Sequence, residues 1–344
     1  MITRFPRHVI LIIACLGLFP GLLISHISLA SQDDISLLEK RTVFERLKGN
    51  LTSPLINRIQ KIPDDFLITI QDNDRSIGIE NSENYVAREI SDEQLNLFNT
   101  YIDLLPKAHQ SAFWSKLLAV YFIDNFSGAG MTEWVVGHDG STYYYLILNS
   151  SLLDVTMDDW LSYKDDSQFD QSASSPTVQV KTQTKFKALM YGLLHEGAHI
   201  VDYELGVTPY VDPQHRRFKG RTQGGSDFTD SIWISGTQPV KRFDLKHRKE
   251  INTYGIFPKR GLISRKELPD MFASLAKSPF VSFYSSTSWN EDLADFITYF
   301  HIEKHLGGVV SVELHGTGEL LDMYAPLHTS FTSQREKSVR MFYE

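Results

Sequence analysis

The chain has 344 residues, of which 42% are hydrophobic and 22% are charged, and its formal net charge is −8. Such a composition is that of a globular protein, long enough for one large domain or two modest ones with real cores. We do not expect a nucleic-acid partner, because the sequence has no basic cluster dense enough to bind phosphates.

The first thirty residues have the pattern of a secretory signal peptide. Arg4 and Arg7 form a short basic start, residues 9–24 are an apolar run, and Ser28 and Ala30 are small residues at the usual cleavage spacing. We therefore expect cleavage after Ala30 and a secreted or periplasmic protein, with no membrane segment after cleavage.

Two alternatives concern the same leader. An uncleaved anchor is disfavoured because the apolar run is short and Pro20 and Gly21 interrupt it. Lipid attachment at Cys15 is disfavoured because apolar residues continue after it. Cleavage removes two arginines, no acid and the only cysteine, so the mature net charge becomes −10. Any metal site must then use His, Asp or Glu.

Residues 31–115 are predicted to form a helical N-terminal region. Amphipathic patterns indicate helices near residues 33–50, 91–106 and 109–126, the last of which can run into a strand. Ser91 is a helix-start signal, with Gln94 in the first turn behind it.

Strands are expected next. Residues 132–149 are β-branched and aromatic, and Asp139-Gly140 in their middle predicts a hairpin. The stretch at 142–151 is either an edge strand, which could pair with an extended peptide, or an interior strand. The acidic and polar residues 154–175 are predicted to form a surface loop.

The second half holds two strongly helical segments. Residues 185–206 have one apolar face, begin after a possible cap at Thr182 or Thr184, and end at Gly206. Residues 207–280 are rich in Gly, Pro and charge, and are predicted to be a long insertion with short elements. The second helix is expected at 289–308.

The first of these helices carries His195, Glu196 and His199. Side chains four positions apart share one helix face, so two imidazoles can reach one metal ion at about 2.0–2.1 Å each. The glutamate at the edge of that face can act as general base on a water. The alternative is a structural helix that happens to carry these residues, but they would be costly to bury without a partner.

A catalytic zinc needs a third protein ligand. The sequence N-E-D-L-A-D at 290–295 resembles the N-E-x-x-[SA]-D motif of the gluzincin family of zinc metallopeptidases, in which it follows H-E-x-x-H. The resemblance implies that Glu291 is the third zinc ligand and that Asp295 orients His195. It covers only the two motif helices and the strands before them. The alternative for this motif alone is an acidic helix N-terminus.

One further residue narrows the resemblance. Tyr284 lies seven positions before Glu291, an offset found in the anthrax lethal-factor-like branch of the gluzincins. That branch implies that Tyr284 donates its hydroxyl hydrogen to the developing oxyanion.

Other candidates for the third ligand fit less well. The metzincin pattern would need a ligand at position 205, which is leucine. Asp227, in a sequence similar to the aspzincin signature, is distant along the chain. His301 and His305 form another pair four apart, but His305 lies about 21 Å from Glu291 along a helix axis.

These observations predict an α+β protein in which residues 116–344 form a zincin-like catalytic domain. It would have a small, mostly antiparallel sheet and an active-site helix. The expected function is that of an exported zinc-dependent metallopeptidase that binds Zn²⁺ and acts on a peptide or protein substrate. The alternatives are a non-catalytic binding protein on a metallopeptidase-like fold and a zinc amidase acting on cell-wall peptides.

Overall fold

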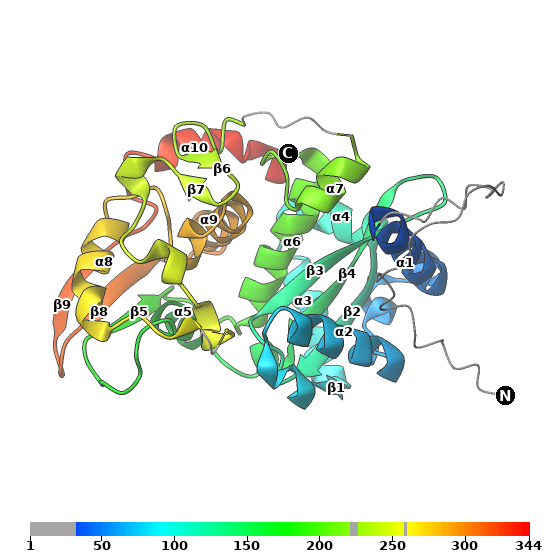
Figure 1. The fold of residues 1–344 in the computed structure, drawn as a ribbon, viewed down its shortest axis with the longest axis horizontal. Coiled ribbons are helices and arrows are strands. Elements are labelled where there is room, and N and C mark those ends of the chain that lie inside the picture. Colours follow the sequence, from blue (N-terminus) through cyan, green and yellow to red (C-terminus); the bar gives the residue numbers. More distant parts are fainter. Residues whose placement is uncertain (1–31, 221–225, 258–259) are drawn as a thin grey trace, which may run out of the picture.

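The computed structural model describes residues 32–220, 226–257 and 260–344, and Figure 1 shows their arrangement. The predicted leader and the alternative lipidation site at Cys15 lie outside these ranges. Within the ranges, no helix combines the length and the apolar character that crossing a membrane requires.

The larger sheet has four strands in the spatial order β1-β2-β4-β3. Strands β1 and β2 are antiparallel, β2 and β4 are parallel, and β3 and β4 are antiparallel. The hairpin predicted around Asp139-Gly140 is confirmed, because β3 and β4 are joined by a turn in which Gly140 has a φ of 75°. The strands are β1 Val86–Arg88, β2 Leu117–Asp124, β3 Gly130–Val136 and β4 Thr142–Asn149.

Strand β4 lies in the interior of this sheet, so the edge position considered for residues 142–151 is wrong. The edge strand next to β4 is β3, the first strand of the hairpin, and β1 is the edge strand on the opposite side. Sheet order depends on the parallel pairing of β2 with β4, which joins residues more than twenty positions apart and leaves no local pattern in the sequence.

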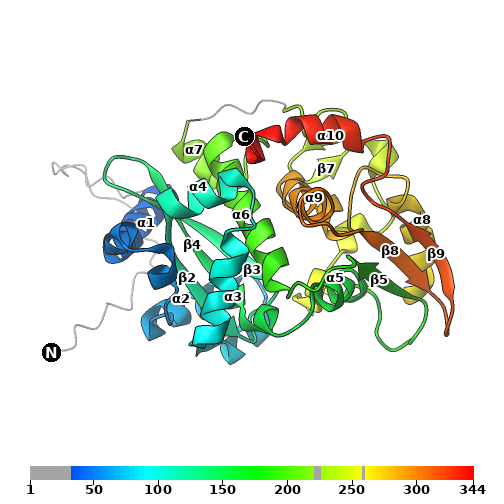
Figure 2. The same cartoon turned by 180° about the vertical axis from the view of Figure 1, so that it is seen from behind.

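Helices cover both faces of this sheet (Figures 1 and 2). One face packs against α1 (Gln32–Leu47) and α2 (Asp64–Ser76), and the other against α3 (Asp92–Ile102), α4 (Lys107–Lys116) and α6 (Leu189–Leu205). The start of α3 is a capping box of Ser91 and Gln94, as expected. The chain passes from α4 directly into β2, which confirms the predicted change from helix to strand.

Most of the rest of the chain forms a second, smaller layer around a three-stranded sheet of order β5-β8-β9, whereas residues 213–218 pack against Trp134 of the larger sheet. The fold is therefore α+β with small sheets, as predicted. Its remaining elements are α5 Met157–Asp166, β5 Thr177–Lys181, α7 Pro213–Phe218, β6 Trp233–Ser235, β7 Gln238–Pro239, α8 Leu268–Leu275, α9 Trp289–Lys304, β8 Ser311–His315, β9 Leu320–Tyr324 and α10 Thr332–Ser338.

Helix α5 corrects the prediction of a surface loop at 154–175. Thr156 caps the helix by accepting a hydrogen bond from the Asp159 backbone, and Trp160 and Leu161 are buried. The acidic composition concealed this pattern, because Lys164 and its neighbour Asp165, counted as surface residues, are also buried.

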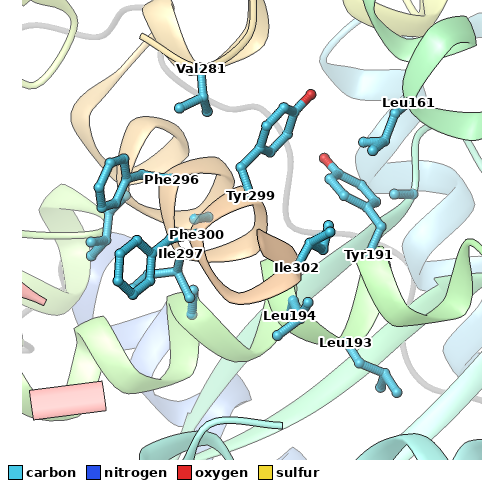
Figure 3. Close-up of a cluster of buried hydrophobic side chains, with 14 of the residues drawn as sticks. Leu161, Tyr191, Leu193, Leu194, Val281, Phe296, Ile297, Tyr299, Phe300 and Ile302 are labelled. Atoms are coloured by element: carbon cyan, nitrogen blue, oxygen red, sulfur yellow. The ribbon is translucent and has the colours of Figure 1, made fainter. Parts of the chain in front are cut away.

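Helices α6 and α9 lie side by side between the two sheets (Figures 1 and 2). Figure 3 shows the apolar side chains around their contact, among them Leu193 and Leu194 of α6 and Ile297 and Ile302 of α9. This packing fixes the spacing of the two helices that carry the predicted motifs.

The ends of α6 differ in part from the prediction. The helix ends at Gly206, whose φ of 66° is the left-handed conformation that glycine adopts most easily. Its start is at Leu189 and has no side-chain cap, so the caps expected at Thr182 and Thr184 are wrong. The Thr182 hydroxyl instead donates to Asp158 of α5.

Candidate metal centre

Helix α6 is buried nearly all round, from Leu189 to Tyr203. His195 and His199 are 4% and 8% exposed, and their rings meet edge to face with centroids 5.0 Å apart. Gly197, between them, lets α4 approach closely, because a β-carbon there would lie 2.3 Å from the ring of His109.

Glu291, in the first turn of α9, closes the group. Its Oε2 lies 3.0 Å from Nε2 of His195 and 3.5 Å from Nε2 of His199. Four ligands at about 2.05 Å around a tetrahedral ion are about 3.3 Å from one another, so these separations suit a common cation. Among the described residues, His195, His199 and Glu291 form the group of histidine and acidic side chains whose ligand atoms lie close enough together, within 4.8 Å of one another, to hold one metal ion.

Electrostatics at the site favour a positive charge. Burial alone would lower the pKa of His195, but hydrogen bonds to Asp295 and Glu291 raise it to about 10. Burial alone would raise the pKa of the Glu291 carboxyl, but the two histidines hold it well below its usual range. A proton on the His195 imidazole therefore stands where a cation would neutralise the carboxylate.

Asp295 lies one turn after Glu291 and orients the first histidine. Its Oδ1 accepts hydrogen bonds from Nδ1 of His195 at 2.9 Å and from the Tyr191 hydroxyl at 3.2 Å. With Nδ1 donating to Asp295, it is Nε2 of His195 that presents a lone pair to the cation position once its own proton has left. Burial raises the pKa of Asp295, but the Lys164 charge and the bond from His195 outweigh it, so this pKa is lowered.

Glu196 projects toward strand β3. The Thr132 hydroxyl lies 2.8 Å from its Oε2, and a β-carbon on Gly130 would lie 3.0 Å from its Cγ. Burial raises the pKa of Glu196, against the lowering effect of the two histidines. A carboxylate held in this way is more basic than one in water, as a general base requires.

Tyr284 lies in a short 3-10 helix, Tyr284–Ser286, and stacks over His195 with ring centroids 6.0 Å apart. It lines the same cavity as His195 and Glu196, which has a volume of about 370 Å³. Burial raises the pKa of Tyr284 well above its ordinary value, so its hydroxyl stays protonated and can donate.

The rival ligands do not join this group. Asp227 is not part of the potential metal-binding group found in the described residues. His301 donates from Nε2 to the Leu104 carbonyl at 2.7 Å, and its ring stacks on those of His305 and Tyr343. This second histidine pair thus packs the C-terminal end of α9.

Sequence reasoning missed two residues that contact the site. Thr132 comes from β3 and Lys164 from α5, and neither belongs to a local motif with the residue it contacts. The sequence does contain one signal that predicts the start of α5. Thr156 is followed three positions later by an acid, Asp159, which is a helix-capping pattern.

The chain matches no family model, and comparisons with curated proteins and with solved structures find no match either.

Proposed function

We propose that the protein is a zinc-dependent metallopeptidase of the gluzincin type, with a zincin-like catalytic fold. The observation that carries the proposal is the meeting of His195, His199 and Glu291 at separations suited to one cation. Two imidazoles and one carboxylate are a common ligand set of catalytic zinc, which leaves a fourth position open to water or substrate.

The side chains around this group have the roles that amide hydrolysis needs. When bound, a zinc ion polarises a carbonyl and lowers the pKa of a water to about 7. Glu196 takes a proton from the attacking water and later delivers it to the leaving amine. Tyr284 donates its hydroxyl hydrogen to the oxyanion that develops on the substrate carbonyl.

Strand β3 offers a backbone edge for an extended substrate. Asn149 donates to the Ala129 carbonyl at 2.8 Å, so the residues that bond directly to the strand opposite are 129, 131, 133 and 135. The backbone groups of Gly130 and Thr132 therefore point away from β4, beside Glu196. An extended peptide that pairs with them would bring its carbonyl close to the general base.

At the other end of the β3 edge, a backbone carbonyl already has a hydrogen-bond partner. The Trp134 carbonyl, which also points away from β4, accepts a hydrogen bond from Lys40 of α1 at 3.0 Å. A substrate strand that pairs with β3 would therefore be limited to the part of the edge next to the metal centre.

Export is part of the proposal, since the residues before the described part of the chain have the pattern of a signal peptide. N-terminal sequencing of the mature protein tests it, with Ser31 as the expected first residue.

The catalytic role is tested with Glu196→Gln. This variant should keep about one zinc per chain, because Glu196 is not a ligand, and should lose peptide-bond hydrolysis. Glu204→Gln is the matched control on the same helix, where the hydrogen bond from Tyr144 can be kept. Unstructured protein chains, folded proteins and cell-wall peptides serve as substrates. Full activity of Glu196→Gln on all of them would refute the mechanism.

A further inference from the structure

Lys164 of α5 is a fully buried lysine, with 0% of its side chain exposed. Lysine is almost never fully buried unless it is paired, because its charge is costly to remove from water. Its ammonium group contacts Oδ2 of Asp295, a carboxylate that is itself fully buried and lies 131 positions away in the sequence.

The two oxygens of Asp295 have different partners. Oδ1 faces α6, where it accepts from His195 and Tyr191. Oδ2 faces the other way and accepts from Lys164 and from the Ser282 hydroxyl. Because a carboxylate is planar, partners that hold Oδ2 also fix the direction of Oδ1, and with it the ring of His195.

Aromatic rings surround the ammonium group of Lys164. Its Nζ lies 5.2 Å from the ring centroid of Tyr191, 5.7 Å from that of Tyr284 and 5.8 Å from that of Tyr299. These rings come from α6, from the segment before α9 and from α9 itself. The lysine therefore contacts each of the elements that form the metal centre, and the rings restrict its movement.

A second ion pair on α5 serves as a structural comparison for the pair of Lys164 and Asp295. Asp166 of α5 binds Arg265 through two oxygens, with nitrogen-oxygen distances of 2.8 and 3.0 Å, and Arg265 is also buried. This pair joins α5 to the segment before α8 and has no contact with the three candidate ligands in the interactions described. Lys164, two positions earlier, contacts the carboxylate behind His195.

We propose that Lys164 is a positioning residue, which acts through Asp295 to hold His195 in the orientation that binds the metal. The proposal rests on the proposed function, since it assumes that the site binds zinc. It assigns Lys164 no contact with the substrate and no part in proton transfer.

The test compares Lys164→Met with wild type and with Arg265→Met, which removes a buried cation from a pair on the same helix. Zinc affinity is measured by chelator competition, and ligand geometry by the absorption spectrum of the Co²⁺-substituted protein. Lys164→Met should lower zinc affinity by about 10- to 100-fold, the usual effect of removing an outer-shell partner, and should change the Co²⁺ spectrum. Arg265→Met should change neither.

A double-mutant comparison shows whether the effect passes through Asp295. Adding Lys164→Met to Asp295→Asn should leave zinc affinity unchanged, because the carboxylate that Lys164 holds is already gone. The double variant removes both buried charges, so it can be compared with Asp295→Asn even if Lys164→Met alone does not fold.

The outcomes separate the two proposals. A wild-type protein that binds no zinc ends the proposed function, and the role of Lys164 falls with it. Zinc binding by wild type and equally tight binding by Lys164→Met overturn the role of Lys164 alone. A further loss of affinity in the Asp295→Asn background would also overturn it, since Lys164 would then act by another route.

Discussion

Gly197, inside the H-E-x-x-H sequence, allows α6 to pack against α4, and replacing it by alanine tests how tightly this contact is built. The new β-carbon would lie 2.3 Å from Cδ2 of His109 and 3.1 Å from Cζ of Phe113. The His109 ring cannot move aside freely, because it is fully buried and its Nε2 donates to the Leu194 carbonyl at 2.9 Å.

The expected cost follows from three contributions. Overpacking a core costs about 1–3 kcal/mol, and a broken hydrogen bond that leaves a buried group unpaired costs about 1–3 kcal/mol. Alanine in a helix interior is favoured over glycine by about 1 kcal/mol, which offsets part of this. Gly197→Ala should therefore lower the free energy of unfolding by about 1–5 kcal/mol, and a shifted α6 should also weaken zinc binding.

Gly192→Ala is the matched control on the same helix. Its β-carbon would lie 2.7 Å from the end of the Leu152 side chain, which is flexible and can turn away, and 3.6 Å from Leu148, which is an ordinary contact. We expect its free energy of unfolding to stay within about 1 kcal/mol of wild type. The free energies of unfolding of both variants are measured by urea unfolding at 25 °C, and are comparable if the dependence on urea concentration is the same as in wild type. The reasoning is refuted if Gly197→Ala is as stable as wild type, or more stable than Gly192→Ala.

Three more predictions concern side chains around the site. Burial raises the pKa of Asp165 to about 7 despite the nearby Lys164 charge, so its contribution to stability is present below pH 4 and is lost as pH rises through 7. Asp165→Asn should accordingly raise the free energy of unfolding at pH 8 by up to about 4 kcal/mol and leave it nearly unchanged at pH 4, and equal effects at both pH values would contradict this. Tyr284→Phe should lower kcat by about 10²- to 10³-fold with zinc retained, as for other oxyanion donors, and an unchanged kcat would remove the tyrosine from the mechanism. Thr132→Val should reduce kcat/KM by about 10- to 100-fold, the equivalent of a hydrogen bond to a charged group, whereas Thr132→Ser should keep most of the activity; similar losses in both variants would mean that the hydroxyl is not what matters.

The residues of the candidate site that could be predicted belong to two local patterns. His195 and His199 share a helix face because they are four positions apart, and Glu291 and Asp295 do so for the same reason. The structure brings His195, His199 and Glu291 together into one group, as predicted from the presence of both motifs in this order along the chain. What each does in a reaction stays a prediction until activity is measured.

The residues that could not be predicted are those that tertiary contacts bring to the site. Thr132 reaches Glu196 across 64 positions and Lys164 reaches Asp295 across 131, and neither pair has a spacing that periodicity can detect. The acidic and polar composition of residues 154–175 predicted a surface loop, and the buried position of Lys164 within it is unusual for a lysine. The choice between an edge and an interior position for β4 stayed open for a related reason, since local signals predict strands but not their order in a sheet.

Metal analysis of the protein purified without chelators tests the central claim most directly. We predict about one zinc per chain in wild type, held with an affinity that Glu291→Ala lowers sharply, because a three-residue ligand set loses its carboxylate. A wild-type protein without stoichiometric metal, or a Glu291→Ala variant that binds zinc as tightly as wild type, would contradict the account.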